Sequence, residues 1–460
     1  MLAVDNQLTV HDLVPGLATL WQRSGQKILS IAATPELAQA TPVFTVQGKY
    51  QPQGWTEWTQ GFQFGAALLQ YDATGDSQFL DLGLKNTMQK MASHVTHFGV
   101  HDHGFNNVST YGNLRRLMLE HRMDDALLPA CTIALQASAA VQANRWSVTS
   151  GGSGYIYSFN GPHSLFCDTI RSLRSLAVGH QLGHAIWSEN DEQISLLDRL
   201  LHHAHTTAEY NVYYGTGRDH FDERGRVAHE SIFNTNDGNY RCPSTQQGYS
   251  PFSTWTRGLA WIMAGYPEQL EYLATRPDNE FDTWGGRNAV VSWMLEAATA
   301  ACDFFIQNTH RCGIPFWDTG APGIQRLDAP LEQDADPFND AEPVDSSAAA
   351  IGVQGLLRLG HYLQENGQAE QGRHYWQAGL TTMRTLLSDQ YLNPDSHHQG
   401  LLLHSIYHRP RNWDYTPPGR AIPCGESCMW GDYHLLEAAL YLQRIAQQQP
   451  YYTFFGPSQS

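Results

Sequence analysis

Residues 56–96 read TEWTQGFQFGAALLQ, YDATGD and SQFLDLGLKNTMQKMASHVT, and this stretch predicts two helices joined by a tight turn. Gly75, between two polar residues, is typical of such a turn. In the second helix apolar side chains recur at the helical spacing of three or four residues, as at Leu80, Leu84, Met88 and Met91. We therefore expect a helical hairpin, with helices over residues 56–70 and 77–96.

The same apolar pattern continues along the chain and predicts about twelve helices with almost no strand. Besides the hairpin, we expect helices over residues 16–33, 104–121, 125–143, from 168 onward, 189–211, 255–274, 288–307, 345–365, 369–388 and 426–447. Short turns alternate with long irregular connections, of which 212–253 and 311–344 are the longest. Helices joined in this way pair as hairpins, with their long loops at one end.

We therefore predict an all-α fold, a six-hairpin (α/α)6 barrel whose long loops line one mouth. The alternative, an open α-solenoid, would show a repeat of fixed period, and the sequence has none. We expect one catalytic domain over residues 1–460, with 1–15 and 449–460 as peripheral tails.

The composition limits the class of ligand. A net charge of -17 argues against nucleic acid and anionic membrane surfaces, both of which favour basic patches. The 13 Trp, 21 Tyr and 18 Phe residues suit a carbohydrate cleft, because sugar rings stack on aromatic faces, although aromatic residues are also common in plain cores. No apolar segment approaches the roughly 18 residues needed to cross a bilayer.

The cysteines and histidines predict neither a disulfide framework nor a metal site. The seven cysteines have no framework spacing, which indicates reduced thiols and a cytoplasmic location. Cys424 and Cys428 lack the second pair that a zinc site needs, so we expect a structural role for them. No signal peptide is visible, although a periplasmic location stays open if one was removed. We expect no metal and no cofactor.

Asp168 is the first candidate for acid–base chemistry. It stands at the start of a predicted helix, after the aromatic, glycine-rich stretch 154–167 that contains Tyr157, Phe159 and Phe166. Aromatic neighbours would desolvate the carboxylate and raise its pKa, which would make it a proton donor at neutral pH. The alternative is that Asp168 only places negative charge at the positive end of a helix.

Other unusual residues fall at loop ends or helix starts, where a barrel of this kind would gather them at one mouth. They are Trp58, Asp102 in the run His101-Asp102-His103-Gly104-Phe105, His229, Gln247, Trp255, Arg257 and Trp261. Taken singly, each has a structural explanation, such as a helix cap, a core aromatic or a buried ion-pair partner. Together they fit an anionic sugar site, with two acids, a guanidinium for a carboxylate and aromatic platforms.

With these motifs the chain resembles the unsaturated glucuronyl hydrolases of glycoside hydrolase family 88, from about residue 55 to 441. The resemblance is strongest in Ser253-Thr254-Trp255-Thr256-Arg257-Gly258 and also covers Ile314-Pro315-Phe316-Trp317-Asp318, Asp345-Ser346-Ser347-Ala348, Leu403-His404-Ser405-Ile406-Tyr407-His408 and Trp430-Gly431-Asp432-Tyr433. It implies that Asp168 is the general acid and base, and that Asp102 is the second essential aspartate. It also implies a subsite for the unsaturated uronate made of Trp58, His229, Gln247, Arg257 and Trp261.

The resemblance implies an unusual reaction on a uronic-acid oligosaccharide. The acid protonates C4 of the C4=C5 enol ether, water adds at C5, and the hemiketal opens to release the second sugar. The chain departs from the family pattern before Asp168, where Phe159 or Tyr157 would replace a stacking tryptophan, and at His103 and Val344.

These departures keep other functions open. The same barrel could hydrolyse saturated glucuronides, or act as a sugar epimerase with His101, His103 or His229 as acid and base. A sugar-binding relative without activity is a further alternative, which the presence of both aspartates disfavours. Both a monomer and a homo-oligomer are compatible with the sequence.

Overall fold

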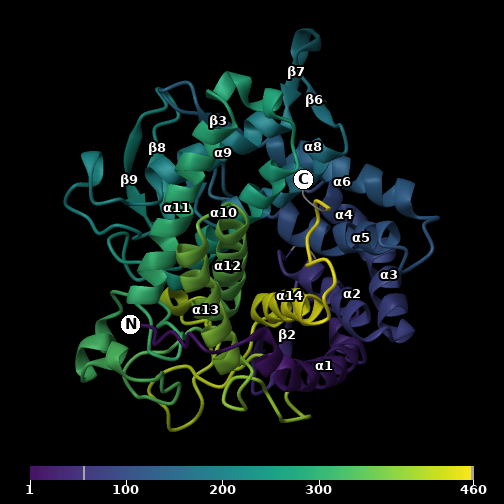
Figure 1. The fold of residues 1–460 in the computed structure, drawn as a ribbon. Helices are drawn as coiled ribbons and strands as arrows, with labels where there is room; N and C mark the ends of the chain where they lie inside the picture. The colour runs from purple at the N-terminus through teal and green to yellow at the C-terminus, as the bar shows by residue number, and fades with distance from the viewer. Residues whose placement is uncertain (55–56, 457–460) are drawn as a thin grey trace.

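The structure, a computed structural model, describes residues 1–54 and 57–456, and its helices form a closed double ring (Figure 1). Six helical segments make the inner ring, and each packs against the next until the last returns to the first. These segments are α2 (Gln60–Thr74), the π-helix η2 (Gly104–Gly112) with α5 (Asn113–Leu119), α7 (Thr169–Ser172) with α8 (Arg174–Gln181), α10 (Thr256–Ala274), α12 (Ser346–Glu365) and α14 (Met429–Ala446). The six-hairpin barrel is therefore confirmed, and the open solenoid is not the fold.

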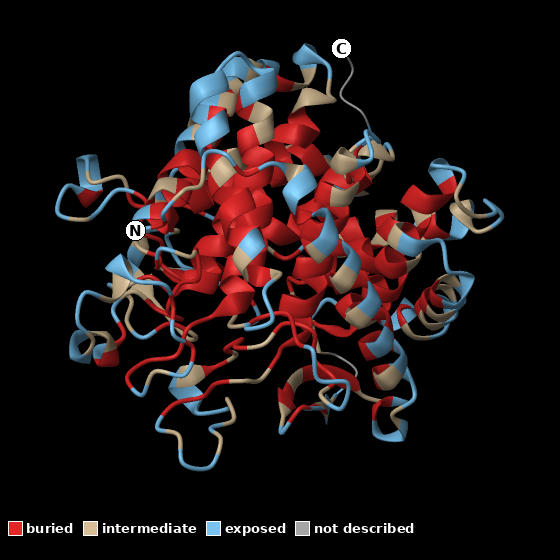
Figure 2. Cartoon of the chain, turned by 60° about the horizontal axis from the view of Figure 1, so that its bottom comes forward, coloured by how far each residue is buried: buried red, intermediate tan, exposed pale blue. Residues whose placement is uncertain are grey.

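The outer ring covers the inner one, with each outer helix packed on one or two inner helices. Its members are α1 (Val10–Ala32), α3 (Ser77–Lys90) followed by the short α4 (Ala92–Val95), α6 (Leu128–Ala143), α9 (Leu196–Tyr210), α11 (Arg287–Gln307) and α13 (Ala369–Leu386). Inner helices such as α10 and α12 are buried along most of their length (Figure 2). At Gly355 a Cβ atom would lie 2.3 Å from the carbonyl oxygen of Met263, so only glycine permits this approach of α12 to α10.

Several helix boundaries differ from the prediction. The helix expected over 189–211 begins only at Leu196, because Ser195 caps it by accepting a hydrogen bond from the Asp198 N–H. The preceding residues form an antiparallel hairpin, β6 (Ala185–Trp187) with β7 (Gln193–Ser195). The helix predicted over residues 56–70 would start at residue 56, which lies outside the described residues. The division into one domain with peripheral tails stays a prediction, although Leu2 and Tyr452 in those tails are buried.

The prediction of almost no strand is wrong for the loops. They contain short antiparallel strands, which are β1 (Thr41–Val46), β2 (Lys49–Gln53), β3 (Trp146–Val148), β4 (Gly154–Ile156), β5 (Ser164–Phe166), β8 (Glu230–Phe233) and β9 (Tyr240–Ser244). In the three-stranded sheet, β8 lies between β5 and β9, so the loop that precedes Asp168 is bound to the one that carries His229. Strands of three to six residues leave little periodic signal, which explains the error.

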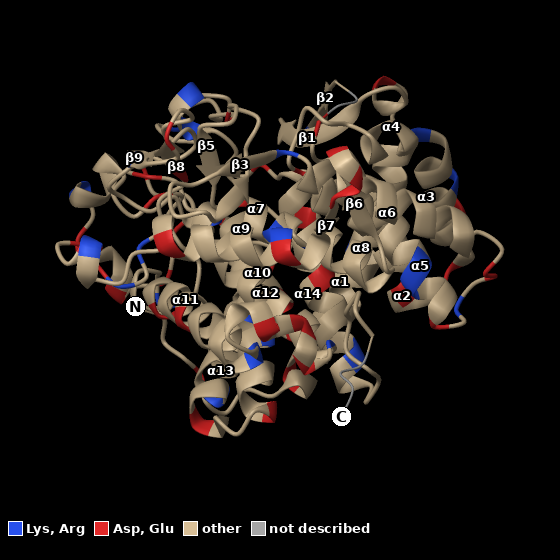
Figure 3. Cartoon of the chain, turned by 90° about the horizontal axis from the view of Figure 1, so that it is seen from above, with Lys and Arg blue, Asp and Glu red and all other residues tan. Residues whose placement is uncertain are grey.

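The distribution of charged residues and the length of one apolar helix bear on the predictions made from composition. Acidic and basic residues of the described chain are interspersed over the molecule in Figure 3, in keeping with a surface that gathers no basic face in that view. In contrast, helix α11 is long and apolar enough, by length and composition alone, to cross a bilayer. The prediction that no segment has this length is therefore wrong. Among the described residues, this helix alone meets the length and composition test, and 56% of its most apolar window is buried. Its apolar side chains pack within the barrel against α10 and α12.

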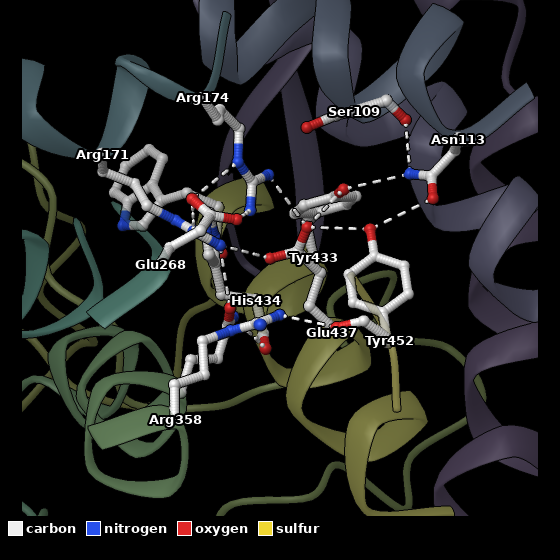
Figure 4. Close-up of polar contacts among 12 residues, drawn as sticks. Ser109, Asn113, Arg171, Arg174, Glu268, Arg358, Tyr433, His434, Glu437 and Tyr452 are labelled. Atoms are coloured by element: carbon white, nitrogen blue, oxygen red, sulfur yellow. Dashed lines mark hydrogen bonds and ion pairs between the residues drawn. The ribbon is translucent and has the colours of Figure 1, made fainter. Parts of the chain in front are cut away.

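A buried ion-pair network joins the inner helices at the centre of the ring (Figure 4). Arg174 of α8 donates to Glu268 of α10 at 2.6 Å and to Glu437 of α14 at 3.1 Å. Arg171 of α7 bonds both carboxylates as well and reaches Gln354 of α12 at 2.9 Å. The four charged side chains are at most 1% exposed, so each carboxylate depends on the arginines to offset its desolvation.

Removing one charge from this network should cost far more stability than removing a surface charge. We expect Glu437→Gln to lower the free energy of unfolding by about 3–5 kcal/mol, because two buried guanidinium groups then share one carboxylate. Asp278→Asn is the control, because the Asp278 side chain is 86% exposed in its pair with Arg287; we expect a loss below about 1 kcal/mol. Chemical denaturation of both variants is the measurement, and equal losses would contradict the prediction.

Candidate active site

A cavity of about 310 Å³ brings together most of the residues that the sequence predicted for the site. Among its lining residues are Trp58, Asp102, Phe159, Asp168, Gln247, Trp255, Arg257 and Trp261. His229 is buried directly behind them, with its ring 4.5 Å from that of Phe166 and 4.6 Å from that of Trp255. These residues come from loops and helix starts far apart in the chain, and the barrel places them around one space. Their individual roles stay predictions.

His101 lies between the two candidate carboxylates. Its Nε2 is 3.3 Å from Oδ1 of Asp168 and 3.6 Å from Oδ1 of Asp102, and all three residues are buried. Asp168 occupies the position before α7, but its side chain makes no capping hydrogen bond. The carboxylate is thus engaged with His101 rather than with the helix end. The sequence motif contained His101, but only the epimerase alternative gave it a role.

The pKa values of Asp102, His101 and Asp168 are shifted by different causes and in different directions. Burial raises the pKa of Asp102, and the nearby charge of Asp168 adds to this effect. Burial alone would also raise the pKa of Asp168, but the hydrogen bond from His101 and the charges of His101 and Arg257 lower it. Burial would lower the pKa of His101, but Asp102 and Asp168 together raise it. The expectation of a raised pKa at Asp168 is therefore wrong, because the hydrogen bond from His101 and the charged neighbours outweigh desolvation.

Arg257 brings a positive charge to the cavity. Its Nη2 donates to the Gln247 side-chain oxygen at 2.5 Å and to the carbonyl oxygen of Tyr407 at 2.9 Å, and Nη1 donates to the carbonyl oxygen of Ile406. The guanidinium lies 4.6 Å from the rings of both Trp255 and Trp430. All of these partners are neutral, and in the described part of the chain Arg257 forms no ion pair. A buried guanidinium whose direct hydrogen-bond partners are all neutral suits an anionic ligand.

His229 is held as a neutral imidazole. Its Nδ1 accepts hydrogen bonds from the backbone N–H groups of Gln246 at 3.0 Å and Gln247 at 3.4 Å, so the ring proton must be on Nε2. Burial lowers the pKa of His229 to about 4, which keeps it uncharged at neutral pH. Nε2 is buried and has no hydrogen-bond partner among the described residues, so this N–H is free to donate.

Aromatic rings form the walls. Trp58 stacks on Trp430 at 4.9 Å, and Trp261 packs at the same distance on Phe105. Phe159 is 56% exposed and lies parallel to the His101 ring at 6.1 Å. Of the two rings proposed to replace a stacking tryptophan, Phe159 lines the cavity, whereas Tyr157 is not among its lining residues and packs on Arg145.

The structure also adds lining residues that the sequence reasoning did not select: Glu57, Val100, His101, Phe105, Gln246, Tyr407, His408, Arg411 and Trp413. Tyr407 and His408 belong to a motif that carried the resemblance, which was a usable signal. Arg411 ends a short 3-10 helix, η8 (Arg409–Arg411), and Trp413 lies in the loop that follows it, so only the fold brings them to the mouth. His103 is not among the lining residues; its Nδ1 lies 2.9 Å from Ser138 Oγ, and burial lowers its pKa to about 3.

Comparisons with known proteins test the resemblance that the sequence predicted. No family model matches the chain. The unsaturated glucuronyl hydrolase of Bacillus sp. strain GL1 is 26% identical over 410 residues, which cover 86% of this chain and 89% of that protein. An unsaturated chondroitin disaccharide hydrolase of Streptococcus agalactiae is 21% identical over 414 residues, covering 86% and 84% of the two chains. The predicted resemblance is confirmed.

Solved structures agree on the fold. The crystal structure of the unsaturated glucuronyl hydrolase from Bacillus sp. GL1 superposes with a TM-score of 0.70 at 23% identity, over 95% of this chain and all (100%) of that one. A mutant of the unsaturated glucuronyl hydrolase from Streptococcus agalactiae, complexed with dGlcA-GalNAc6S, has a TM-score of 0.63 at 20% identity over 95% and 92% of the two chains.

Proposed function

We propose that this protein is a glycoside hydrolase that removes an unsaturated uronic acid from the non-reducing end of lyase-generated oligosaccharides. The observation that carries the proposal is that the guanidinium of Arg257, whose direct hydrogen-bond partners are all neutral, lies in one cavity with the Asp102–His101–Asp168 cluster. The guanidinium provides a site for the uronate carboxylate, and the cluster provides a proton donor and acceptor beside it. The relatives named above, which are called hydrolases of unsaturated glucuronyl or chondroitin units, support the substrate class.

The chain's own residues account for the chemistry in two steps. Asp168 donates a proton to C4 of the C4=C5 enol ether, which leaves positive charge shared by C5 and the ring oxygen. The ionised Asp168 then takes a proton from the water that attacks C5. The resulting hemiketal opens as the bond between C5 and the ring oxygen breaks, which leaves a ketone at C5 and a hemiacetal at C1. Collapse of this hemiacetal breaks the bond between C1 and the second sugar, and the oxygen of the leaving sugar takes the hydroxyl proton. Because a double bond is hydrated, the rule that relates carboxylate separation to retention or inversion does not apply.

Substrate binding favours the protonated form of Asp168, whose pKa is lowered by its neighbours in the protein. The charge of Arg257 is one of the causes that lower the pKa of Asp168. A uronate carboxylate on Arg257 neutralises that charge and adds a negative one nearby, so the pKa of Asp168 rises when the substrate binds. His101, within 3.3 Å of Asp168, is the adjacent group from which the proton moves. Binding of an anionic sugar therefore favours the protonated form of Asp168.

The test is the absorbance of the C4=C5 double bond in a panel of lyase-generated unsaturated disaccharides. We expect the absorbance to fall with the wild-type protein and to rank the panel by the second sugar. A constant absorbance together with release of saturated glucuronic acid from a β-glucuronide would contradict the proposal and assign the saturated activity to this barrel.

A further inference from the structure

A serine hydroxyl joins the backbone segments that carry the two candidate carboxylates. Ser172 is fully buried and ends α7, the helix that begins after Asp168. Its Oγ donates to the carbonyl oxygen of His101 at 2.9 Å and accepts from the N–H of Gly104, also at 2.9 Å. These two peptide groups stand on either side of Asp102. The Asp102 segment is therefore bound to the helix that follows Asp168.

Gln142 of the outer helix α6 completes this arrangement. Its Nε2 donates to the carbonyl oxygen of His101 and to Ser172 Oγ, both at 2.9 Å, and the residue is fully buried. A serine hydroxyl has one donor and two acceptor positions. In Ser172 all three are used, by His101, Gly104 and Gln142. The hydroxyl therefore has one defined orientation.

The two backbones touch at this point. A Cβ atom on Gly104 would lie 2.2 Å from the carbonyl oxygen of Ser172, so no other residue fits there without displacing the π-helix η2. The contact between His101 and Asp168 also tolerates little displacement. His101 Nε2 lies 3.3 Å from Asp168, near the outer limit of a hydrogen bond, so a shift of a few tenths of an ångström away from α7 breaks this contact.

We propose that Ser172, oriented by Gln142, is a positioning residue that sets the separation of Asp102, His101 and Asp168. The inference rests on the proposed function, since it concerns the geometry of that site. Ser172 does not line the cavity and contacts no substrate. It acts through the backbone of residues 101–104, because Asp102 and His101 move with that backbone. Misplacement of reacting groups by about 1 Å can cost on the order of 100-fold in rate.

The first experiment compares Ser172→Ala with Ser175→Ala. Ser175, three residues further along the same inner segment, is 2% exposed, and its hydroxyl has no partner among the described residues. Both variants lose one buried hydroxyl, but only the first loses the link to His101 and Gly104. We expect Ser172→Ala to lower kcat by roughly 10- to 100-fold with little change in KM, and Ser175→Ala to match the wild type. Equal kcat values for the two variants would overturn the proposal.

A second readout needs no substrate. His101 is faced by Asp102, Asp168, Arg145, His203 and His229, and the two carboxylates hold the pKa of His101 above its ordinary value. We expect the pKa of His101, followed by nitrogen NMR and assigned with His101→Gln, to fall in Ser172→Ala and to stay unchanged in Ser175→Ala. If wild-type protein is inert toward unsaturated disaccharides, the proposed function fails, while this titration still tests the positioning role.

Gln142→Met covers the case in which Ser172→Ala does not fold. This variant keeps the bonds from Ser172 to His101 and Gly104 and removes both bonds from Gln142, one to the Ser172 hydroxyl and one to the carbonyl oxygen of His101. We expect a smaller loss of kcat and a smaller fall in the His101 pKa than in Ser172→Ala, both beyond those of Ser175→Ala. Values equal to those of Ser175→Ala would overturn the proposal.

Discussion

Asp168→Asn is expected to lower kcat by about 1,000-fold or more on an unsaturated disaccharide, which corresponds to a loss of about 4 kcal/mol in transition-state stabilisation. Asparagine has nearly the same shape but can neither donate the proton to C4 nor take one from the attacking water. Absorbance of the double bond measures the rate, and thermal unfolding shows that the variant is folded. Full activity in folded Asp168→Asn would exclude Asp168 as the acid.

Asp102→Asn separates the roles of the two carboxylates. The charge of Asp102 raises the pKa of His101. Without it, the imidazole loses its proton at lower pH, so fewer molecules hold the proton that passes to Asp168 at neutral pH. We expect a lower kcat and an alkaline limb of the pH–rate profile that moves to lower pH. Because the three groups titrate together, the profile reports their combined behaviour.

Arg257→Met is expected to lower kcat/KM by about 100- to 1,000-fold, mainly through a higher KM. The loss reflects about 3–4 kcal/mol for the missing partner of the substrate carboxylate. The same variant removes one of the causes that lower the pKa of Asp168, so the pH optimum should move upward. Steady-state kinetics over a range of pH measures both effects.

Two controls make the Arg257 result specific. Arg224→Met removes an arginine whose side chain is 45% exposed and paired with Asp303, and its kcat/KM should match the wild type. A carboxyl-reduced disaccharide, which has no negative charge, should be a poor substrate for wild type and Arg257→Met alike. If Arg257→Met lost equal activity on the charged and the neutral substrate, Arg257 would not bind the carboxylate.

The helical architecture could be predicted because the sequence signals that indicate it are local. Helical periodicity depends on residues a few positions apart, as from Leu80 to Met91, and loop length depends only on where one helix ends and the next begins. The chemistry-bearing residues could be selected for the same reason, since Asp102 and Arg257 stand in short motifs. The short strands escaped prediction because the three residues of β5 and the four of β8 are too few to carry a period, and their pairing joins segments about 65 positions apart.

The sequence by itself determined the closed ring of helical hairpins and the residue types that gather at its mouth, because periodicity and motif both act over short stretches of chain. Only the tertiary structure decided how these residues interact. It placed His101 against Asp168, lowered the pKa of Asp168 while raising that of Asp102, and left Arg257 among neutral partners. The physical reason is that desolvation, charge and hydrogen bonding depend on distances of a few ångströms between residues that the chain alone keeps far apart.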